Sequence, residues 1–416
     1  MQDHSHPPVM GRGLTFLFAL AAGAAVGNLY WAQPLLDFIA ADLHTSTATA
    51  GWLITVTQLG YATGILLLVP LGDVTDRRRF VPVMMLCAAA ALLLCAVAPS
   101  MPVLLLAVTA VGATTVSGQL LTPLAGDLAG DGDRGRVVGV VVSGILTGIL
   151  ASRTISGLVA DVAGWRAIYA LAAAVAVVLA CLLHRAIPPQ QPKARMRYPA
   201  LLASVASAVR RERTVRWTLV LAATGFAAFT LFWTPLTFLL SGPPFGYPVS
   251  VIGLFGLAGL AGAVAAQRAG RLHDRGWSVP ATGAAWALAL VMFAVAAAAG
   301  RSVVLLVVVA VVLDIALQAQ AILNQTRVFA VSGQERSRLN TAYVTGTFLG
   351  GALGSGAATV LWSLGGWTAV TVAGMILSCF ALAVWALGRR GPLLLPPPTP
   401  ALADAPQGGA TVSGKV

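Results

Sequence analysis

The sequence predicts an all-α polytopic membrane protein with twelve transmembrane helices, arranged as two six-helix bundles related by a parallel pseudo-two-fold repeat. Of its 416 residues, 58% are hydrophobic and 10% are charged, whereas soluble domains carry roughly 25% charged residues. Apolar runs of about 20 residues recur along the chain, and each can cross the hydrocarbon core of a bilayer. Short motifs of the first half also return, in the same order, in the second half.

Apolar length and turn signals place the expected helices. The predicted spans are residues 14–36, 49–71, 80–98, 102–127, 137–160, 165–187, 215–240, 250–270, 279–299, 302–327, 340–363 and 367–388. They divide the chain into a cytoplasmic N-terminal tail, a first bundle, a cytoplasmic linker, a second bundle and a disordered tail, at residues 1–13, 14–187, 188–214, 215–388 and 389–416.

The distribution of Lys and Arg predicts the orientation. The net charge is +12, and nearly all of the basic residues outside the spans fall in one set of alternate loops. The opposite set holds only Arg166 and Arg301. Basic residues favour the cytoplasmic side, so we expect a multi-pass protein of the inner membrane with both termini in the cytoplasm. The positive charge then reflects orientation and attraction to membrane lipids rather than nucleic-acid binding.

The repeat consists of four motif pairs. The pairs are Gly72-x3-Asp76-Arg77 with Gly270-x3-Asp274-Arg275, Arg134-x-Arg136 with Arg336-x-Arg338, Gly164-Trp165 with Gly366-Trp367, and Trp31-Ala-Gln-Pro34 with Trp233-Thr-Pro235. Each pair occupies equivalent positions on the same predicted side of the membrane. The two halves are therefore expected to be related by an axis along the membrane normal, as in the two halves of major facilitator transporters.

On these motifs the chain resembles the major facilitator superfamily over residues 14–388. The run Asn28–Leu36 and the segment 327–354 are similar to a bacterial branch of drug, sugar and nucleoside efflux permeases. The resemblance implies secondary transport of a small molecule by alternating access between the two halves. The sequence contains no phosphate-binding loop with its lysine and no catalytic or metal-ligand motif of soluble enzymes. We therefore expect no enzyme activity, no cofactor and no bound metal.

Two charged residues inside the spans are candidates for proton coupling. Asp314 is the acidic residue near the middle of a span, and Arg153 is the only basic residue predicted inside the membrane. Intramembrane charges are costly and are functional candidates by default. Asp314 could instead be a structural carboxylate or a substrate contact, and Arg153 could snorkel to the outer surface. A direct pair between them is a further possibility.

Arg153 also ends a stretch that partly resembles the antiporter motif of the superfamily. Gly144 and Gly148 keep the motif, whereas Ile149 replaces its proline, and Ser152 and Arg153 replace its last glycines. The departure weakens the case for antiport. The small residues still favour close helix approach.

The resemblance implies that the first, fourth, seventh and tenth helices line the substrate cavity. Aromatic rings with a few hydrogen-bonding groups suit an amphipathic organic compound. The predicted substrate-binding residues are Asn28, Tyr30, Trp31, Gln33, Gln119, Phe229, Trp233, Gln318 and Gln325. Each aromatic residue alone could instead serve packing or interfacial anchoring.

The first motif pair predicts a cytoplasmic gate. In the resembling family, its Asp and Arg pair across the interface between the halves and separate as the cavity opens inward. The predicted gate residues are Gly72, Asp73, Asp76, Arg77, Gly270, Asp274, Arg275, Arg336 and Arg338. Asp76 is also expected to start the third span, where the helix dipole favours an anion.

Our sequence-based hypothesis is a monomeric, proton-coupled exporter (an antiporter) of a small amphipathic compound, with the substrate and protons as its partners. An importer of a sugar, nucleoside or organic acid, working as a symporter or uniporter, is the closest alternative. A membrane receptor or a polytopic membrane enzyme is a remote one.

Overall fold

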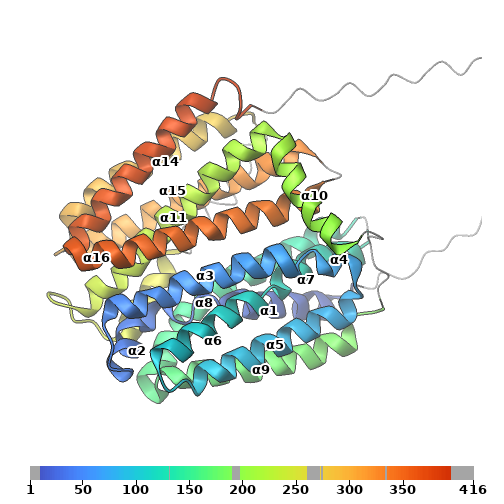
Figure 1. Cartoon of the computed structure of the whole chain (residues 1–416), viewed down its shortest axis with the longest axis horizontal. Coiled ribbons are helices and arrows are strands. Elements are labelled where there is room, and N and C mark those ends of the chain that lie inside the picture. Colours follow the sequence, from blue (N-terminus) through green and yellow to red (C-terminus); the bar gives the residue numbers. More distant parts are fainter. Residues whose placement is uncertain are drawn as a thin grey trace, which may run out of the picture.

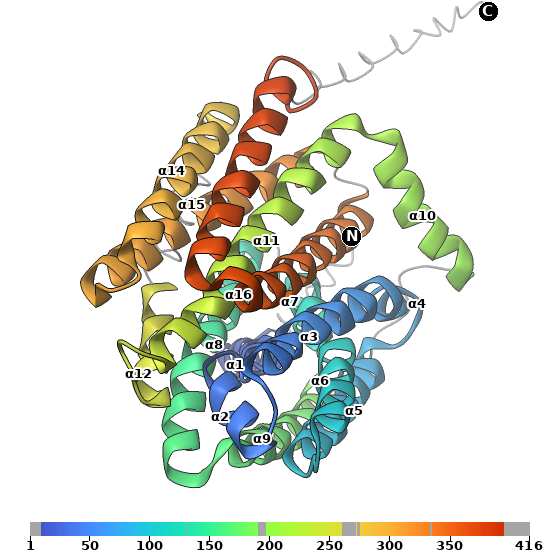
Figure 2. The same ribbon diagram turned by 60° about the vertical axis from the view of Figure 1, so that its left-hand side comes forward.

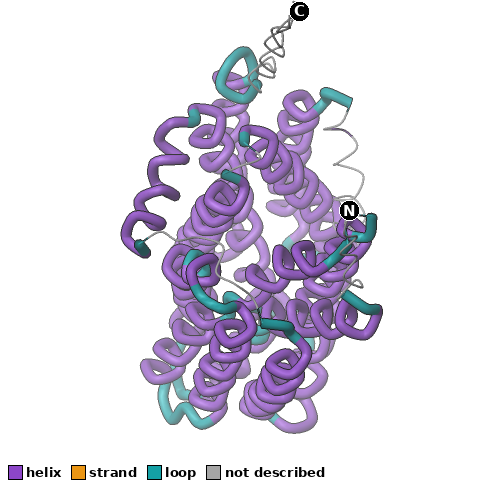
Figure 3. The backbone as a smooth tube through the Cα atoms, turned by 90° about the vertical axis from the view of Figure 1, so that its right-hand side faces the viewer, coloured by secondary structure: helices purple, strands orange, loops and turns teal. Residues whose placement is uncertain are grey.

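The computed structural model describes residues 10–130, 132–189, 197–259, 272, 275–332 and 335–394. Within these ranges the chain forms helices and turns and contains no β-strand (Figure 3). Most of the long helices run in one general direction across the molecule (Figure 1). Nine helices in the described ranges are long and apolar enough to cross a membrane. The polytopic helical class is therefore confirmed, while the count of twelve stays a prediction.

The helices before residue 189 form one group. They are α1 (Arg12–Gly27), η1 (Gln33–Leu35), α2 (Leu36–Asp42), α3 (Thr47–Leu68), α4 (Leu71–Val74), α5 (Arg77–Ala96), α6 (Met101–Thr114), α7 (Ser117–Leu128), α8 (Arg134–Ala163) and α9 (Trp165–Ala186). In Figure 2 this group, coloured blue to green, lies below the later helices.

The later helices form the second group. They are α10 (Tyr198–Arg211), α11 (Arg213–Ser241), α12 (Val249–Leu254), η2 (Phe255–Ala258), α14 (Ser278–Ala299), α15 (Val303–Val331) and α16 (Arg336–Gly388). Most of the predicted span 250–270 lies outside the described residues. The predicted domain boundaries remain expectations.

Helix α16 contains two helices joined by a kink, as the predicted spans 340–363 and 367–388 require. Gly365 and Gly366 leave the helical conformation there, and Gly366 has a φ of 57°. Gly164, between α8 and α9, has a φ of 80°. Glycine adopts positive φ without the steric cost that a side chain imposes. The Gly-Trp repeat therefore marks the same sharp junction in each half.

The tryptophans after these glycines are buried and fix the junctions. The Trp367 Nε1 donates to the Ala296 carbonyl at 2.7 Å, and the Trp165 Nε1 donates to Asp42 Oδ2 at 3.1 Å. Arg166 pairs with the same carboxylate. The hydrogen bonds from Arg166 and Trp165 hold the pKa of Asp42 below its usual value, and the bond from Arg166 has the largest effect.

The predicted first span, residues 14–36, is not one helix. Helix α1 ends at Gly27, turns follow, and a short 3-10 helix begins at Gln33. Pro34 stands at the start of this 3-10 helix, where its missing N–H is tolerated. The predicted fourth span, 102–127, is likewise divided into α6 and α7. Thr114 at the break donates its hydroxyl to the Ala110 carbonyl at 2.7 Å, a bond that often bends helices.

Helices α1 and α8 touch through their backbones. A Cβ on Gly148 would lie 2.2 Å from the Gly23 carbonyl oxygen, and one on Gly23 would lie 2.4 Å from the Gly144 oxygen. The sequence-based expectation of close helix approach at Gly144 and Gly148 is therefore confirmed. This seam fixes α8, which carries Arg153, against the first helix.

Helix α10 contacts both groups of helices. The Tyr198 hydroxyl donates to the Leu67 carbonyl in α3 at 2.7 Å. Arg211, at the other end of α10, pairs with Glu335 beside α16 at 2.5 Å. Figure 2 shows α10 extending from α11 toward α4. The predicted linker thus contains a helix that joins the two groups at one end of the molecule.

Candidate functional site

Arg153 and Asp314 lie buried where the two groups of helices meet. Arg153, on α8, is 4% exposed, and Asp314, on α15, is 2% exposed. The segment from α12 to Gly259 runs directly past both. A Cβ on Gly256 would lie 3.0 Å from the Arg153 side chain, and one on Gly259 would lie 3.8 Å from Asp314 Oδ2. Small residues on this segment therefore leave the space that the two charged side chains occupy.

Three aromatic rings surround the Arg153 guanidinium. Its Cζ lies 4.6 Å from the Trp233 ring centroid, 5.4 Å from that of Tyr30 and 5.5 Å from that of Phe229. Such contacts attract a cation to the ring face. Tyr30 belongs to the first group of helices, whereas Phe229 and Trp233 are on α11 in the second. The ring cage is therefore built from both groups.

Several polar atoms in this centre have no hydrogen-bond partner among the described residues. They are Arg153 Nε and Nη2, Asp314 Oδ2 and Gln33 Oε1. Arg153 and Asp314 attract each other electrostatically and Asp314 also interacts with Trp233, but they form no direct ion pair within 4.0 Å. A buried polar atom without a hydrogen bond is costly. A polar group that binds in this centre would supply the missing hydrogen bonds.

The predicted substrate-binding residues do not form one site. Tyr30, Gln33, Phe229 and Trp233 gather at Arg153. Gln119 instead donates to the Tyr61 hydroxyl at 3.3 Å.

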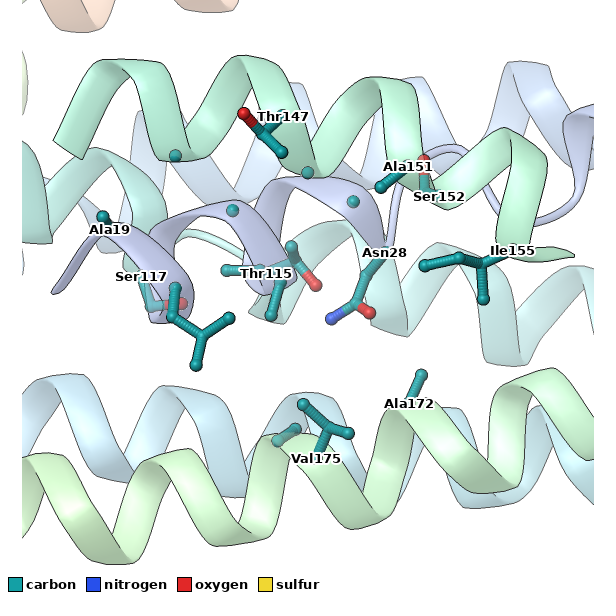
Figure 4. Close-up of a pocket in the computed structure, with 18 of the residues that line it drawn as sticks. Ala19, Asn28, Thr115, Ser117, Thr147, Ala151, Ser152, Ile155, Ala172 and Val175 are labelled. Atoms are coloured by element: carbon teal, nitrogen blue, oxygen red, sulfur yellow. The ribbon is translucent and has the colours of Figure 1, made fainter. Parts of the chain in front are cut away.

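Asn28 and Trp31 line a different cavity, shown in Figure 4. The Trp31 Nε1 donates to Asn28 Oδ1 at 2.8 Å.

The polar residues of α15 differ in burial. Gln318 and Gln325 are only partly buried, whereas Gln320, Asn324 and Arg327 are buried. Gln320 Nε2 donates to the Leu221 carbonyl at 2.8 Å. Helical periodicity alone does not show which side of α15 packs against α11. The sequence therefore could not predict which of these glutamines is buried.

Arg327, at the end of the predicted span 302–327, is one of three buried arginines among the described residues. It is 1% exposed, and its guanidinium donates to Ser278 Oγ at 2.9 Å, Thr282 Oγ1 at 3.1 Å and Asn324 Oδ1 at 3.1 Å. Arg153 is therefore not the only arginine buried in a long apolar helix. The i, i+3 spacing of Asn324 and Arg327 was a sequence signal for this contact.

The first predicted gate motif forms a compact cluster, the Arg77 cluster, composed of Arg77, Asp73 and Asp127. Arg77 pairs with Asp73 at 2.5 Å and with Asp127 at 3.1 Å, and its Nε donates to the Gly72 carbonyl at 2.8 Å. Both carboxylates belong to the same group of helices as Arg77. These ion pairs therefore lie within one half rather than across the interface.

One contact of this cluster does cross to the other half. The Ser337 hydroxyl on α16 lies 3.2 Å from Asp73 Oδ2 and donates to it. Nearby, Arg338 lies 3.7 Å from Glu335, and the Arg336 guanidinium lies 5.6 Å from the Phe329 ring centroid. A serine thus joins Asp73 of the first half to the second half.

Asp76 has the local role that its position predicts. It is the N-cap of α5, and its Oδ1 accepts from the Arg78 backbone N–H at 2.9 Å. Such caps satisfy one of the free N–H groups at a helix start. The second motif is not comparable, because Gly270 and Asp274 lie outside the described residues. Arg275 is exposed.

Comparisons with known proteins agree on the family. The family model described as Major Facilitator Superfamily matches residues 15–326. The Uncharacterized transporter YgaY of Escherichia coli O157:H7 is 41% identical over 372 residues, which are 89% of this chain and 94% of that protein. The transporter SCO4007 of Streptomyces coelicolor is 37% identical over 372 residues, 88% of this chain and 86% of that protein.

Solved structures share the fold at low sequence identity. A variant of the nucleoside transporter NupG aligns with a TM-score of 0.74 at 14% identity, covering 90% of this chain and 99% of that one. A bacterial homologue of the human lysosomal transporter Spinster, inward-facing and occupied, aligns with a TM-score of 0.71 at 14% identity, covering 91% and 96%. The chain belongs to the Major Facilitator Superfamily, and it is a multi-pass membrane transporter rather than an enzyme.

Proposed function

We propose that this transporter exports a small amphipathic organic compound in exchange for protons, with Asp314 as the proton-binding group. One observation carries the proposal. Asp314 and Arg153 are buried together where the halves meet, each has unpartnered polar atoms, and neither neutralises the other through a direct ion pair. Such an arrangement is costly to maintain for stability alone, which favours a role in transport.

Protonation would change the charge of this centre. With Asp314 ionised, its charge offsets that of Arg153 across the ring cage. When Asp314 binds a proton, Arg153 loses this counter-charge, and burial makes an isolated cation unfavourable. The centre then favours a rearrangement of the halves in which Arg153 meets water. Protonation of Asp314 would therefore return the empty carrier, and proton and substrate would cross the membrane in opposite directions.

The surroundings support an amphipathic compound as the substrate. Trp233, Phe229 and Tyr30 offer ring surface, and Gln33 offers an unpartnered carbonyl oxygen. Apolar walls with a few polar groups are typical of small-molecule sites. The space around Gln33 and Trp233 is small in this structure, so binding requires the halves to separate.

The direction of coupling can be tested in proteoliposomes. A screen for compounds that raise the apparent melting temperature would first identify a ligand, because a ligand that binds the folded state stabilises it. The labelled ligand is then offered outside vesicles that carry a pH gradient of either sign. Proton antiport predicts accumulation when the lumen is acidic. Accumulation only with an acidic exterior would indicate a symporter, and indifference to the gradient would indicate a uniporter.

The role of Asp314 is tested in the same vesicles. Asp314→Asn should abolish gradient-driven accumulation while retaining exchange of labelled for unlabelled ligand, because the neutral amide resembles the protonated acid. Asp133→Asn is the matched control, since Asp133 is an exposed carboxylate paired with Arg136 at 3.0 Å. Full accumulation by Asp314→Asn would show that the proton binds elsewhere.

The predicted orientation and oligomeric state belong to the same proposal. The basic residues concentrate in alternate loops, which favours an inner-membrane protein with both termini in the cytoplasm. We also propose that it acts as a monomer. Labelling of single cysteines at residues 166 and 211 by an impermeant maleimide on intact cells should modify only the first, since the loops that carry them are predicted to lie on opposite sides.

A further inference from the structure

A second cavity lies within the first group of helices, apart from the Arg153–Asp314 centre. It has a volume of about 590 Å³, within the range of small-molecule sites. Figure 4 shows it between two layers, with α1 and α8 on one side and α9 on the other. We call it the lateral groove, because of where it opens.

The mouth of the groove faces the side of the helix bundle. Phe16, Leu20, Ile155 and Val175 line it and are 68%, 49%, 40% and 37% exposed. Apolar side chains exposed on the middle of long helices contact lipid in a membrane protein. The groove therefore opens to the hydrocarbon interior of the bilayer.

The back of the groove is closed by the α1–α8 seam. Gly23, Gly144 and Gly148 line the groove and also make the backbone contacts between these helices. The two helices pack so closely that a single added Cβ would overlap a carbonyl oxygen. No passage for a ligand remains between them. The lateral groove is thus a separate compartment from the ring cage, although Ser152 in its wall adjoins Arg153 in sequence.

Two polar side chains in the groove keep unused hydrogen-bonding capacity. Asn28 Oδ1 accepts from Trp31 at 2.8 Å, which leaves its Nδ2 without a hydrogen bond to any described residue. Thr115 is 0% exposed, and its hydroxyl has no partner in the described part of the chain. Figure 4 shows the Asn28 amide pointing from the end of α1 toward α9, with Thr115 on the same stretch of wall.

Two further hydroxyl groups of the wall are already used as donors, whereas no side-chain hydrogen bond joins the Ser117 or Ser143 hydroxyl to another described residue. Thr147 donates to the Ser143 carbonyl at 2.9 Å, and Ser152 donates to the Ile149 carbonyl at 2.8 Å. The described residues around the groove include no charged side chain. Most of the lining side chains are apolar, and an apolar wall does not favour a water-filled groove. A charged ligand would have no counter-charge there.

From these observations we propose that the lateral groove binds an uncharged, lipophilic molecule that enters from the bilayer and carries one hydrogen-bond-accepting oxygen, such as a carbonyl. The Asn28 Nδ2 and the Thr115 hydroxyl donate to that oxygen, and the apolar wall holds the hydrocarbon body. A phospholipid acyl chain would fill the volume but would leave both donors unpaired. The site does not depend on proton coupling at Asp314.

The proposal is tested by photolabelling in proteoliposomes with two probes. One is a long-chain methyl ketone that carries a diazirine in its chain, and the other is the same hydrocarbon without the carbonyl. After irradiation, adducts are located by peptide mass spectrometry. We expect the ketone to label the groove-lining parts of α8 and α9 at least about fivefold more than the hydrocarbon, which corresponds to a single hydrogen bond. Equal labelling by the two probes would mean a groove filled by any hydrocarbon chain and would overturn the proposal.

Two substitutions on α9 provide a matched pair. Val175→Trp places a large ring in the mouth of the groove, whereas Val178→Trp adds the same ring to a 57% exposed position that does not line it. Ketone labelling should fall at least fivefold in the first variant and stay unchanged in the second, with similar apparent melting temperatures. Undiminished labelling in Val175→Trp would place the ketone elsewhere and reject the site.

Asn28→Leu tests the hydrogen bond to the ligand while leaving the volume of the groove nearly unchanged. It replaces the amide donor with an apolar side chain of similar size, so ketone labelling should fall toward the level of the hydrocarbon probe, with the Thr115 hydroxyl as the remaining donor. Asp314→Asn should leave labelling unchanged, and this distinguishes the groove from the proposed transport centre. Loss of ketone labelling in Asp314→Asn would contradict the independence of the two sites.

Discussion

Arg77 and Arg153 are both buried in the first group of helices, yet their charges are balanced in different ways. Arg77 has two carboxylates within ion-pair distance and a backbone carbonyl on its Nε. Arg153 has rings on its faces, and its Nε and Nη2 have no hydrogen-bond partner among the described residues. The first arrangement satisfies its arginine within one half. The second leaves an arginine unsatisfied where the halves meet.

This difference indicates that Arg77 serves the stability of the fold and that Arg153 serves transport. A buried charge that is fully paired resists removal because its partners would be left uncompensated. A buried charge without partners costs stability in the resting structure and becomes favourable only when another group joins it. We therefore expect substitutions at Arg77 to change folding more than transport, and substitutions at Arg153 to do the reverse.

The largest effect on transport is expected at Arg153. Arg153→Gln keeps a polar side chain but removes the charge, and exchange of the labelled ligand should fall about 100-fold if it loses about 3 kcal/mol of interaction. The apparent melting temperature should stay constant or rise, because two unpartnered donors disappear. Arg166→Gln is the control, because Arg166 forms an exposed ion pair with Asp42. Normal exchange by Arg153→Gln would remove Arg153 from the transport centre.

Arg77→Gln should have the largest effect on stability. It leaves Asp73 and Asp127 near each other without their shared cation, at a cost of about 2 kcal/mol after allowance for partial exposure. Thermal unfolding in detergent should show a lower midpoint. Adding Asp127→Asn should recover part of the loss, since one of the two carboxylates beside residue 77 is then neutral. An unchanged midpoint in Arg77→Gln would mean that the cluster does not hold the fold.

Asp76→Asn is expected to have an intermediate effect. Asparagine is also a good N-cap, so the start of α5 should persist, whereas Asp76→Ala should cost about 1 kcal/mol. Loss of the charge should slow transport by about threefold without altering the order of substrate preference, a change of roughly 0.7 kcal/mol in the barrier. Exchange rates for several ligands test this. A changed order at a normal rate would argue against a gate.

The smallest effect is expected at Ser337. Ser337→Ala removes the hydrogen bond to Asp73 that joins the two halves, and an exposed bond of this kind contributes about 0.5 kcal/mol. The exchange rate should change by less than about twofold. A larger change than that of Asp76→Asn would make the Ser337 contact, rather than the Arg77 cluster, the main element of the gate.

The internal repeat predicted the family and the helix junctions, but not the surroundings of repeated residues. Gly164-Trp165 and Gly366-Trp367 form equivalent junctions because positive φ and a buried indole are local requirements. Trp31 and Trp233 also occupy matching positions in the repeat. They differ because α1 ends at Gly27, while α11 continues to Ser241 through Pro235. One indole therefore lines the lateral groove and the other contacts Arg153.

The candidate site was predicted in part for a similar reason. An intramembrane Asp and Arg stand out in an apolar sequence, so Asp314 and Arg153 were found without the structure. Which glutamine of α15 is buried depends on the neighbour α11, and this information lies outside the local sequence. Arg327 was not singled out because a basic residue at the end of a span has an ordinary explanation as a topology signal.

The α1–α8 seam also constrains how this protein can evolve. Any single-base change that replaces Gly23, Gly144 or Gly148 by another amino acid introduces a side chain, and the smallest one already overlaps a facing carbonyl oxygen. Accepted mutations in these codons are therefore expected to be synonymous, or to occur together with compensating substitutions on the opposite helix. This seam should therefore keep its sequence while the surrounding walls vary.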